Sequence, residues 1–287
     1  MKLTDLHIHT SFSDGEYSLE QIITELRRKE ITTFSITDHD NIHSYDTIHN
    51  YDLSGMHYIP GVEVSSYLKV NNTKYKTHVL LYNYQHNLNH LRNLLKDILE
   101  KRTERIHEML SIIEFNNNFR FTEEEIDAIF NQKGSVGKPQ VINCLSKKLN
   151  ISTNLEVYNR YLKNIKTTKE YRRNIVDVIQ IARQTGALVG VAHPKEIEND
   201  HNVDFAKLIP HYVNLGIDFI EIANSLHTNA DMQRYLTLAN QYNLLTSGGS
   251  DFHGPFVKPS AQLGILTKDG FTHNQNSEDI FTLTKKL

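Results

Sequence analysis

Histidine and carboxylate side chains stand together at several points of the sequence, in spacings that suit metal coordination. His7 and His9 form a His-x-His element, and Asp251 and His253 form an Asp-x-His element far along the chain. In an extended segment residues i and i+2 point the same way, so both members of a pair can reach one ion. Further candidates of the same types are Asp14, Asp38, His39, Asp40, Glu63, His78 and His193.

Short apolar segments, each of which predicts a β-strand, come directly before most of these residues. The segments span residues 2–6, 33–36, 57–64, 79–82, 188–192, 219–222 and 244–247. His78 instead stands at the start of one of them. Since catalytic groups gather at the C-terminal ends of the strands in α/β barrels, residues that are distant in sequence can converge there. We therefore predict one site that holds several metal ions.

Helical patterns separate several of the predicted strands. Ser18 and Gln21 form a capping box directly before the apolar positions of a first helix. Two more helices are predicted over residues 175–184, where Gly186 ends the pattern, and over residues 231–242. Strands that alternate with helices indicate a parallel sheet, either barrel-like or doubly wound.

The alternation stops in the middle of the chain, where the pattern becomes entirely helical. Apolar spacing predicts one long amphipathic helix over residues 88–113. Thr122 and Glu125 form the capping box of a second helix, and Pro139 marks the start of a third. We predict that residues 88–171 form a helical insertion domain that covers the active site. Residues 1–87 and 172–287, called the frame below, form the metal-binding domain.

Charge is distributed unevenly between these parts. The formal net charge is −3, but the segment from Leu88 to Asn174 carries 16 Lys and Arg against 11 Asp and Glu. An acidic frame with a basic segment suits metal ions together with an anionic substrate. A solvated helical surface would give the same count, so both interpretations stay open.

Composition limits the class of protein. The chain has 287 residues, of which 39% are hydrophobic, so it can bury a full core. The single cysteine, Cys144, excludes an intramolecular disulfide. The sequence has neither the apolar segment of a signal peptide nor an apolar run of the roughly 18 residues that a membrane span needs. We therefore expect a cytoplasmic protein with no membrane partner.

The motifs, in their order along the chain, resemble those of the polymerase and histidinol phosphatase (PHP) superfamily of metal-dependent phosphoesterases. They are Asp5-Leu6-His7-Ile8-His9-Thr10, Ser13-Asp14-Gly15, Thr37-Asp38-His39-Asp40, Gly61-Val62-Glu63, Ala192-His193-Pro194 and Gly249-Ser250-Asp251-Phe252-His253. The resemblance covers nearly the whole chain. It implies an α/β fold, a distorted (βα)7 barrel, with the helical insertion added.

The resemblance also implies a set of metal ligands. A first ion would be held by His7, His9, Glu63 and Asp251, a second by Glu63, His78 and His193, and a third by Asp14, His39 and His253. The residues expected to act in catalysis are His7, His9, Glu63, His193 and Asp251.

The ligand types indicate the cofactor and its chemistry. Imidazole and carboxylate suit two or three divalent ions, with manganese as the first expectation and iron or zinc as alternatives. Two such ions can hold a water as hydroxide in line with phosphorus, which predicts hydrolysis of a phosphate ester. Asp5, Asp38 and Asp40 could orient the histidine ligands. They could equally serve only to cap turns.

Within the superfamily the chain resembles the subgroup that hydrolyses nucleoside 3',5'-bisphosphates and trims short RNA from the 5' end. Arg102 and Arg105 match a phosphate-binding helix, Lys138 a basic-Pro element, and His227 a substrate-side histidine. Arginine can grip a second phosphate with two hydrogen bonds. Where relatives place Gly-Arg after His-Pro, this chain has Lys195 and Glu196, so one phosphate contact differs.

Two other functions remain open at this stage. A histidinol-phosphate phosphatase would need a small pocket with acidic residues in place of the two arginines. A non-catalytic, metal-stabilised PHP module is the third possibility, although the chain carries no polymerase region. The main prediction is a nucleotide phosphoesterase, with short single-stranded RNA as a further substrate.

Overall fold

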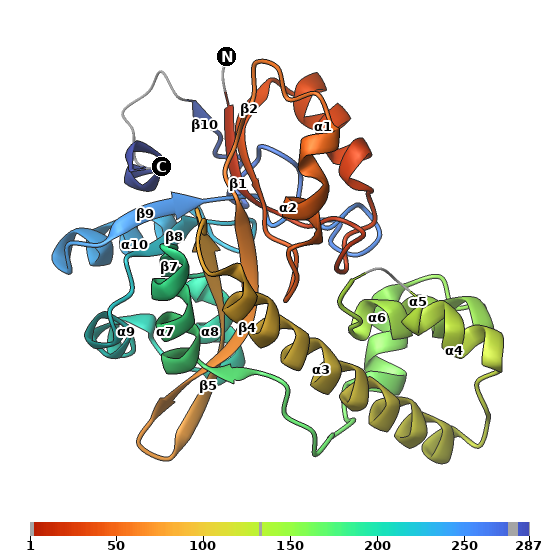
Figure 1. Ribbon diagram of the computed structural model, residues 1–287. Helices are drawn as coiled ribbons and strands as arrows, with labels where there is room; N and C mark the ends of the chain where they lie inside the picture. The colour runs from red at the N-terminus through yellow and green to blue at the C-terminus, as the bar shows by residue number, and fades with distance from the viewer. Residues whose placement is uncertain (1–2, 132–133, 275–280, 287) are drawn as a thin grey trace.

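The structure is a computed structural model that describes residues 3–131, 134–274 and 281–286. Helices and strands alternate in its first part (Figure 1). The elements of this part are β1 (Leu3–Ile8), α1 (Leu19–Arg28), β2 (Ile31–Ile36), α2 (His43–Thr47), β3 (His57–Tyr58), β4 (Gly61–Val70) and β5 (Thr73–Tyr82).

The helical segment follows and then the alternation resumes. The middle of the chain forms α3 (Leu88–Asn117), α4 (Glu123–Phe130), α5 (Lys138–Leu149) and α6 (Asn154–Val157). The last part forms β6 (Arg173–Asn174), α7 (Ile175–Thr185), β7 (Leu188–Val191), α8 (Pro194–His201), α9 (Ile209–Leu215), β8 (Phe219–Ala223), α10 (Asn229–Gln241), β9 (Leu245–Gly248) and β10 (His273–Asn274).

The strands form two sheets that meet along two seams. One sheet has the order β10-β1-β2-β3 and the other β6-β4-β5-β7-β8-β9. Isolated bridges join them, between Ile8 and Phe252 at one seam and between His39 and Glu63 at the other. The described strands thus form a mixed α/β fold with parallel pairs β1–β2, β7–β8 and β8–β9, and no continuous ladder closes them into one sheet.

A purely parallel sheet was the wrong expectation for the strands β4 and β5. They form an antiparallel hairpin, and β5 also runs antiparallel to β7. The predicted strand over residues 57–64 is divided at Pro60, and its second part continues to Val70 before a two-residue turn that begins at Asn71, with φ +53°. The far end of the hairpin is exposed and polar, so it left no apolar run in the sequence.

The predicted helix boundaries that rest on capping are confirmed. The capping boxes of Ser18 with Gln21 and of Thr122 with Glu125 are both formed. Gly186 ends α7 in the left-handed conformation, with φ +77°. The helices α8 and α9 were not predicted, because they are short and each follows its neighbouring element after only a few residues.

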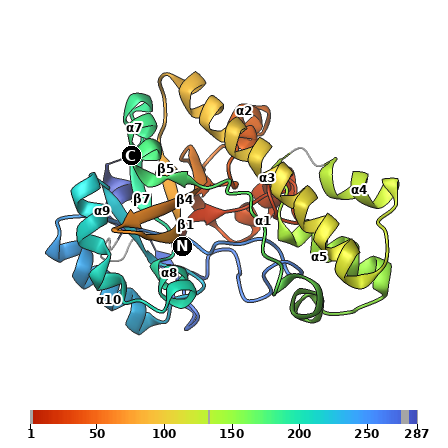
Figure 2. The same ribbon diagram turned by 90° about the horizontal axis from the view of Figure 1, so that it is seen from below.

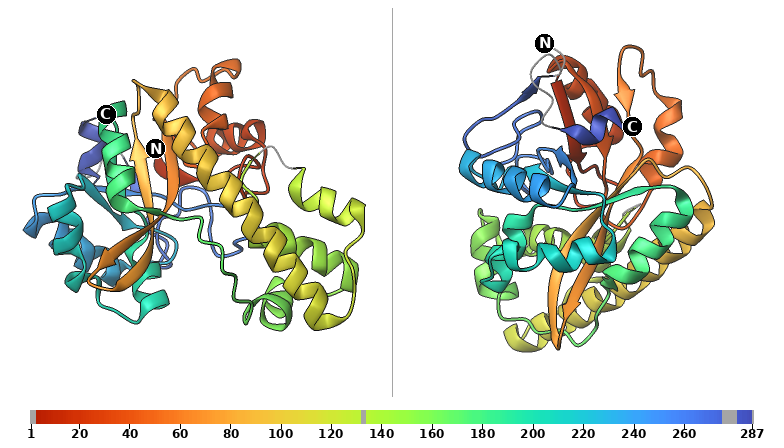
Figure 3. Two further views of the ribbon diagram at one scale, coloured as in Figure 1. Left: turned by 60° about the horizontal axis from the view of Figure 1, so that its bottom comes forward. Right: turned by 90° about the vertical axis from the view of Figure 1, so that its left-hand side faces the viewer.

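Two apolar cores lie at the two ends of helix α3. Leu91, Leu95 and Ile98 in its first half pack into the large core beneath β4, β5, β7 and β8. Ile106 and Ile113 in its second half belong to a separate core whose members all come from residues 106–162. Figures 1 and 2 show α4 and α5 grouped around this far end, away from the sheets, and Figure 3 repeats the arrangement from other sides.

Helix α3 is the longest helix, with 30 residues, and it is amphipathic rather than apolar throughout. In the described part of the chain, no helix combines the length and the apolar character that crossing a membrane requires.

Candidate metal centre

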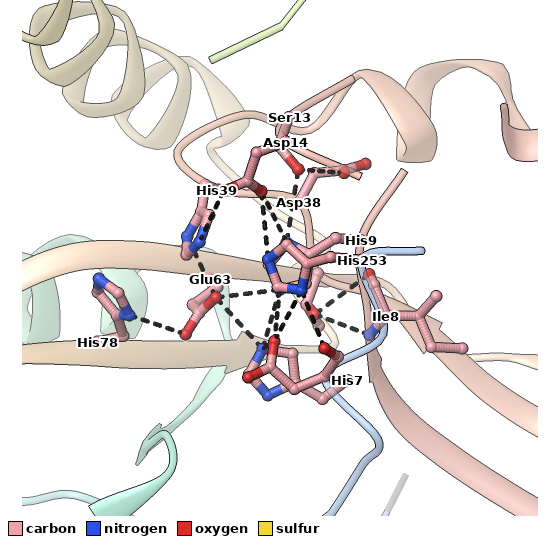
Figure 4. A network of polar contacts seen from close by, with 12 residues as sticks. His7, Ile8, His9, Ser13, Asp14, Asp38, His39, Glu63, His78 and His253 are labelled. Atoms are coloured by element: carbon pink, nitrogen blue, oxygen red, sulfur yellow. Dashed lines mark hydrogen bonds and ion pairs between the residues drawn. The ribbon is translucent and has the colours of Figure 1, made fainter. Parts of the chain in front are cut away.

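The carboxylate of Glu63 in β4 lies at the centre of the histidine cluster, and its two oxygens face different imidazoles (Figure 4). Its Oε2 lies 3.2 Å from Nε2 of His7, 3.2 Å from Nε2 of His9 and 3.1 Å from Nδ1 of His39. Glu63 and His7 are fully buried, so this half of the cluster is shielded from water. One carboxylate oxygen therefore faces three imidazole nitrogens.

The other oxygen of Glu63 faces the opposite side of the cluster. Its Oε1 lies 3.2 Å from Nδ1 of His78 and 2.8 Å from Nε2 of His193. The Nδ1 atom of His193 lies 2.8 Å from a carboxylate oxygen of Glu196. Glu196 thus adds a carboxylate to this side that the sequence did not predict as a ligand.

Asp251 and Asp14 complete the cluster beside His253. Asp251 Oδ1 lies 3.3 Å from Nε2 of His9 and 3.3 Å from Nδ1 of His253. Asp14 Oδ1 lies 3.3 Å from Nε2 of His253, and its Oδ2 lies 3.8 Å from Nε2 of His39. All nine residues proposed as ligands are therefore brought together from six segments of the chain.

The arrangement of donor atoms fits divalent cations. Nε2 of His7 and Nε2 of His9 lie 3.1 Å apart, and at most one of them can carry a proton toward the other. Buried atoms without a hydrogen bond include Oε2 of Glu63, Nδ1 of His39 and Oδ1 of Asp14. A cation at these positions would satisfy them, because imidazole nitrogen and carboxylate oxygen are ligands for such ions.

Several groups of side chains have ligand atoms close enough together to hold one metal ion, and some of these groups share Glu63, His9 or His39. They are His7, His9 and Glu63; His9, Asp14, His39 and His253; His39, Glu63 and His78; His78, His193 and Glu196; and His7, His193 and Asp251. The first of these is part of the ligand set that the resemblance implies for the first ion, and the second contains the whole set implied for the third ion.

The electrostatics of the cluster favour bound cations as well. Burial alone lowers the pKa of His9, but the nearby carboxylates of Asp251 and Glu63 outweigh it and raise that pKa to about 9. Burial raises the pKa of Glu63, whereas its histidine neighbours, His39 foremost, hold it well below the usual range. Glu63 is therefore ionised, and a metal ion would compete with protons for the nearby imidazoles.

The backbone fixes the ligand segments with strong local constraints. The N–H of Asp251 donates to the carbonyl oxygen of His7 at 2.7 Å, and the N–H of His9 donates to that of Phe252 at 2.9 Å. A Cβ on Gly249 would lie 2.2 Å from the His7 nitrogen, so only glycine permits this approach. Asp251 and His193 also have positive φ, +53° and +24°, a strained conformation that recurs at functional sites.

Glu221 in β8 is a supporting residue that the sequence interpretation missed. Its Oε1 lies 2.9 Å from Nδ1 of His7, and its Oε2 accepts the backbone N–H of His193 at 2.7 Å. A carboxylate on the outer nitrogen fixes the tautomer of a histidine ligand. The sequence did hold a signal for Glu221, since it is an acidic residue inside the apolar segment 219–222. Glu221 is fully buried in the structure.

Asp5 and Asp38, which could have played this part, hold backbone and hydroxyl groups instead, and Asp40 holds such groups of Ser65 together with the Arg102 guanidinium. Asp38 accepts from the N–H and hydroxyl of Thr10 and from the hydroxyls of Ser13 and Ser44. Asp5 accepts the N–H groups of Ser250 and Gly264, and burial raises its pKa to about 6. Their contacts agree with the turn-holding role.

Arg102 and Arg105 of α3 approach the aromatic ring of Tyr171 together with Arg172. The guanidinium carbons lie 4.7, 5.5 and 4.7 Å from the ring centroid for Arg102, Arg105 and Arg172. Arg102 is buried and donates to Asp40 at 2.7 Å, so its charge is already compensated. Arg105 donates only to the Lys169 carbonyl oxygen, at 3.2 Å, among the hydrogen bonds of the described residues.

The other substrate-binding candidates lie in three different settings. The ammonium of Lys138 lies 5.3 Å from the Tyr158 ring, and burial together with the charge of Arg105 lowers its pKa. Lys195 pairs with Asp231 at 2.9 Å. His227 is fully buried, with Nδ1 2.8 Å from the carbonyl oxygen of Ile222, and burial lowers its pKa to about 4.

A pocket of about 260 Å³ opens at the cluster and is lined by Asp14, Glu63, His193 and Lys258, among others. A smaller cavity of about 30 Å³ adjoins it at His78 and Glu196 and continues to Lys76 and Arg172. The metal-binding candidates are therefore accessible from outside, with cations to one side.

Comparison with known proteins identifies the family. The model of the PHP domain matches residues 5–172. The chain belongs to the PHP domain family. A solved metal-dependent phosphoesterase from Bifidobacterium adolescentis shares the fold, with a TM-score of 0.78 and 21% identity over 93% of each chain.

Three curated PHP relatives match 88% of this chain. The phosphoribosyl 1,2-cyclic phosphate 1,2-diphosphodiesterase of Eggerthella lenta is 25% identical, and 95% of its length is matched. The 5'-3' exoribonuclease Rnm of Escherichia coli is 25% identical over 85% of its length. The 3',5'-nucleoside bisphosphate phosphatase of Chromobacterium violaceum is 23% identical over 87% of its length.

Proposed function

We propose that this PHP protein is a metal-dependent phosphoesterase that hydrolyses phosphate esters of nucleotides. The preferred reaction is removal of the 3'-phosphate from nucleoside 3',5'-bisphosphates, with the 5' ends of short RNA as a further substrate. The observation that carries the proposal is the position of Glu63, whose two carboxylate oxygens lie within 3.2 Å of nitrogens from five histidines.

The ligand assignment follows the contacts around Glu63. His7, His9 and Asp251 would hold one ion on the Oε2 side, and His78 and His193 a second on the Oε1 side. Asp14, His39 and His253 would hold a third. When bound, such ions supply a water that is activated near neutral pH and neutralise charge on the phosphoryl group. Manganese is our first choice, before iron or zinc.

The chain's own residues hold this arrangement ready. Glu221 keeps the outer nitrogen of His7 engaged and so presents its Nε2 to Glu63. The same carboxylate binds the backbone N–H of His193 and positions the ring that faces the other Glu63 oxygen. Preorganised ligands of this kind lower the reorganisation that the reaction requires.

A second phosphate would be gripped on the cationic side of the pocket. Arg105 and Lys138 are close enough for their charges to interact, and Arg172 and Lys76 line the cavity that adjoins His78 and Glu196. Converging cations suit a phosphate. The carboxylates of Glu196 and Asp200 line the same cavity. The bisphosphate phosphatase and the exoribonuclease among the relatives support a nucleotide substrate rather than histidinol phosphate or a non-catalytic role.

Three broader features belong to the same proposal. Strands β1, β2, β4, β5, β7, β8 and β9, with their two seams, would represent a distorted (βα)7 barrel. Residues 88–171 would form an insertion domain that covers the active site, and the protein would act in the cytoplasm. The separate core of residues 106–162 supports the insertion.

Phosphate release from adenosine 3',5'-bisphosphate by manganese-loaded protein tests the function. AMP, histidinol phosphate, phosphoribosyl 1,2-cyclic phosphate and short 5'-phosphorylated RNA would be compared with it, beside metal-stripped protein. We expect metal-dependent release that is fastest from the bisphosphate. Selective cleavage of histidinol phosphate would overturn the substrate assignment, and equal rates with stripped protein would overturn the metal mechanism.

A further inference from the structure

A larger pocket lies beside the metal centre, between the first loop of the frame and helix α5. Its volume is about 470 Å³, within the range of about 300–1,000 Å³ that is usual for small-molecule sites. Asp14 and Val257 line both this pocket and the metal-centre pocket, so the two lie next to each other. A molecule whose phosphate reaches the cluster can therefore extend into it.

Phe256 presents an exposed aromatic ring at this pocket on a fixed backbone. Its side chain is 42% exposed, which is unusual for a phenylalanine. The N–H groups of Phe256 and Val257 both donate to Oε1 of Glu16 at 2.5 Å, and the Phe256 carbonyl accepts from Asn154 at 2.8 Å. A backbone held in this way loses little conformational freedom when a ligand covers the ring.

Phe12 contributes a second aromatic side chain, and its backbone is also held. Its carbonyl oxygen accepts from the side-chain amide of Asn41 at 2.6 Å and from the N–H of Ser135 at 3.1 Å. Its ring packs on His43, with 5.7 Å between ring centroids. The pocket thus has aromatic groups from two segments that are far apart in sequence.

The charges of the pocket exclude a phosphate as its occupant. The residues that line it in the described structure include the carboxylates of Asp14 and Glu16 and no lysine or arginine. The amide of Asn143, one turn along α5 from Pro139, offers a donor and an acceptor. Such a site fits a flat, uncharged group with polar edges.

We propose that this pocket receives the nucleobase of the substrate, with Phe256 as the stacking side chain and Asn143 at the edge of the base. The inference rests on the proposed nucleotide phosphoesterase function and adds a specificity site to it. The 3'-phosphate then reaches the metal centre, and the second phosphate lies on the side of Arg172 and Lys138. Stacking accepts any base, because every base has an aromatic face.

The kinetic test compares adenosine 3',5'-bisphosphate with the abasic 3',5'-bisphosphate, in which hydrogen replaces the base. We expect wild-type protein to prefer the adenosine compound by about ten-fold or more in kcat/KM. Phe256→Ala should remove most of this preference and leave the abasic rate unchanged, and Phe256→Tyr should restore it. Phe115→Ala, at a ring that is 88% exposed on α3, is the matched control and should change neither rate.

A binding test separates this inference from the catalytic proposal. The chain contains no tryptophan, so Phe256→Trp introduces a single indole as a reporter. Saturable quenching by adenosine 5'-phosphate, absent with ribose 5-phosphate, is expected even in metal-stripped protein that releases no phosphate. The base site is overturned if ribose 5-phosphate quenches equally, or if Phe256→Ala slows the adenosine and abasic compounds to the same extent.

Discussion

The frame around Glu63 and the helical segment around Tyr171 use charge in opposite ways. In the frame, carboxylate oxygens and imidazole nitrogens face one another at about 3.3 Å, and several of these buried atoms have no hydrogen bond. Around Tyr171 three arginines converge on one ring, and Arg105 has only a backbone carbonyl as hydrogen-bond partner among the described residues. The first arrangement suits divalent cations, and we propose that the second receives an anionic group of the substrate.

Arg102 joins the two regions. It comes from α3 but donates to Asp40 and to the hydroxyl of Ser65, which also holds Asp40. Asp40 lies next to His39, so the helical segment is coupled to a ligand-bearing loop of the frame. Arg102 and Arg105 are only one helical turn apart, yet Arg102 is part of a buried network, whereas we propose a binding role for Arg105.

The largest effect is expected for Glu63→Gln. The change keeps the shape but removes the charge that faces five histidines, so turnover should fall by about 1,000-fold or more, since metal catalysis supplies several kcal/mol. Phosphate release and metal content by mass spectrometry would be measured together. Glu123→Gln, at an exposed residue of α4, is the control. Retention of full activity and metal content by Glu63→Gln would remove the centre from the mechanism.

Arg102→Met should destabilise the fold by about 3 kcal/mol, because it leaves the fully buried Asp40 carboxylate without its cation. The measurement is the free energy of unfolding from denaturant titration. The control is Arg92→Met. Arg92 lies on the same helix as Arg102 and pairs with Asp46, but these two side chains are 41% and 35% exposed. This substitution should cost less than about 1 kcal/mol. Equal costs for the two variants would remove the coupling role of Arg102.

The folded protein should become less stable as the pH falls, because His227 is held neutral in it. Burial lowers its pKa to about 4 in the folded protein, against 6.5 when unfolded, so the unfolded chain binds the proton first as the pH falls. Between about pH 7.5 and about pH 5 this residue should cost about 2 kcal/mol of stability. His227→Gln should show that much less loss over the same window. Parallel stability curves for the two proteins would show that His227 is not held neutral.

The smallest effect is expected for Arg105→Ala. If this arginine grips a remote phosphate, its loss should raise KM for adenosine 3',5'-bisphosphate by about ten-fold and leave kcat and the KM for a monophosphate nearly unchanged. Arg183→Ala, which breaks a pair with Asp218 in the frame, is the control and should change neither constant. A fall in kcat alone would instead place Arg105 near the reacting group.

The sequence by itself determined the candidate residues of the centre and, for those that follow β1, β2, β7 and β9, the strand that comes before them. Glu63 and His78 instead lie within β4 and β5. Residue type, the i and i+2 spacing and the apolar run before most of the motifs are local properties, so they are visible without a fold. Capping boxes such as Ser18 with Gln21 are equally local, and the structure forms them. The amphipathic pattern of α3 is also local, so the helix was predicted from it. Its apolar residues pack into two different cores.

Only the tertiary structure decided which residues support and surround the centre. Glu221 acts on His7 from a strand 214 residues away, and Glu196 meets His193 through a helix that sequence patterns did not reveal. The order of β4, β5 and β7 and the clustering of Arg172 with Arg105 at Tyr171 also depend on pairing across long stretches of chain. Such pairings follow from which faces pack together, and local sequence patterns do not carry that information.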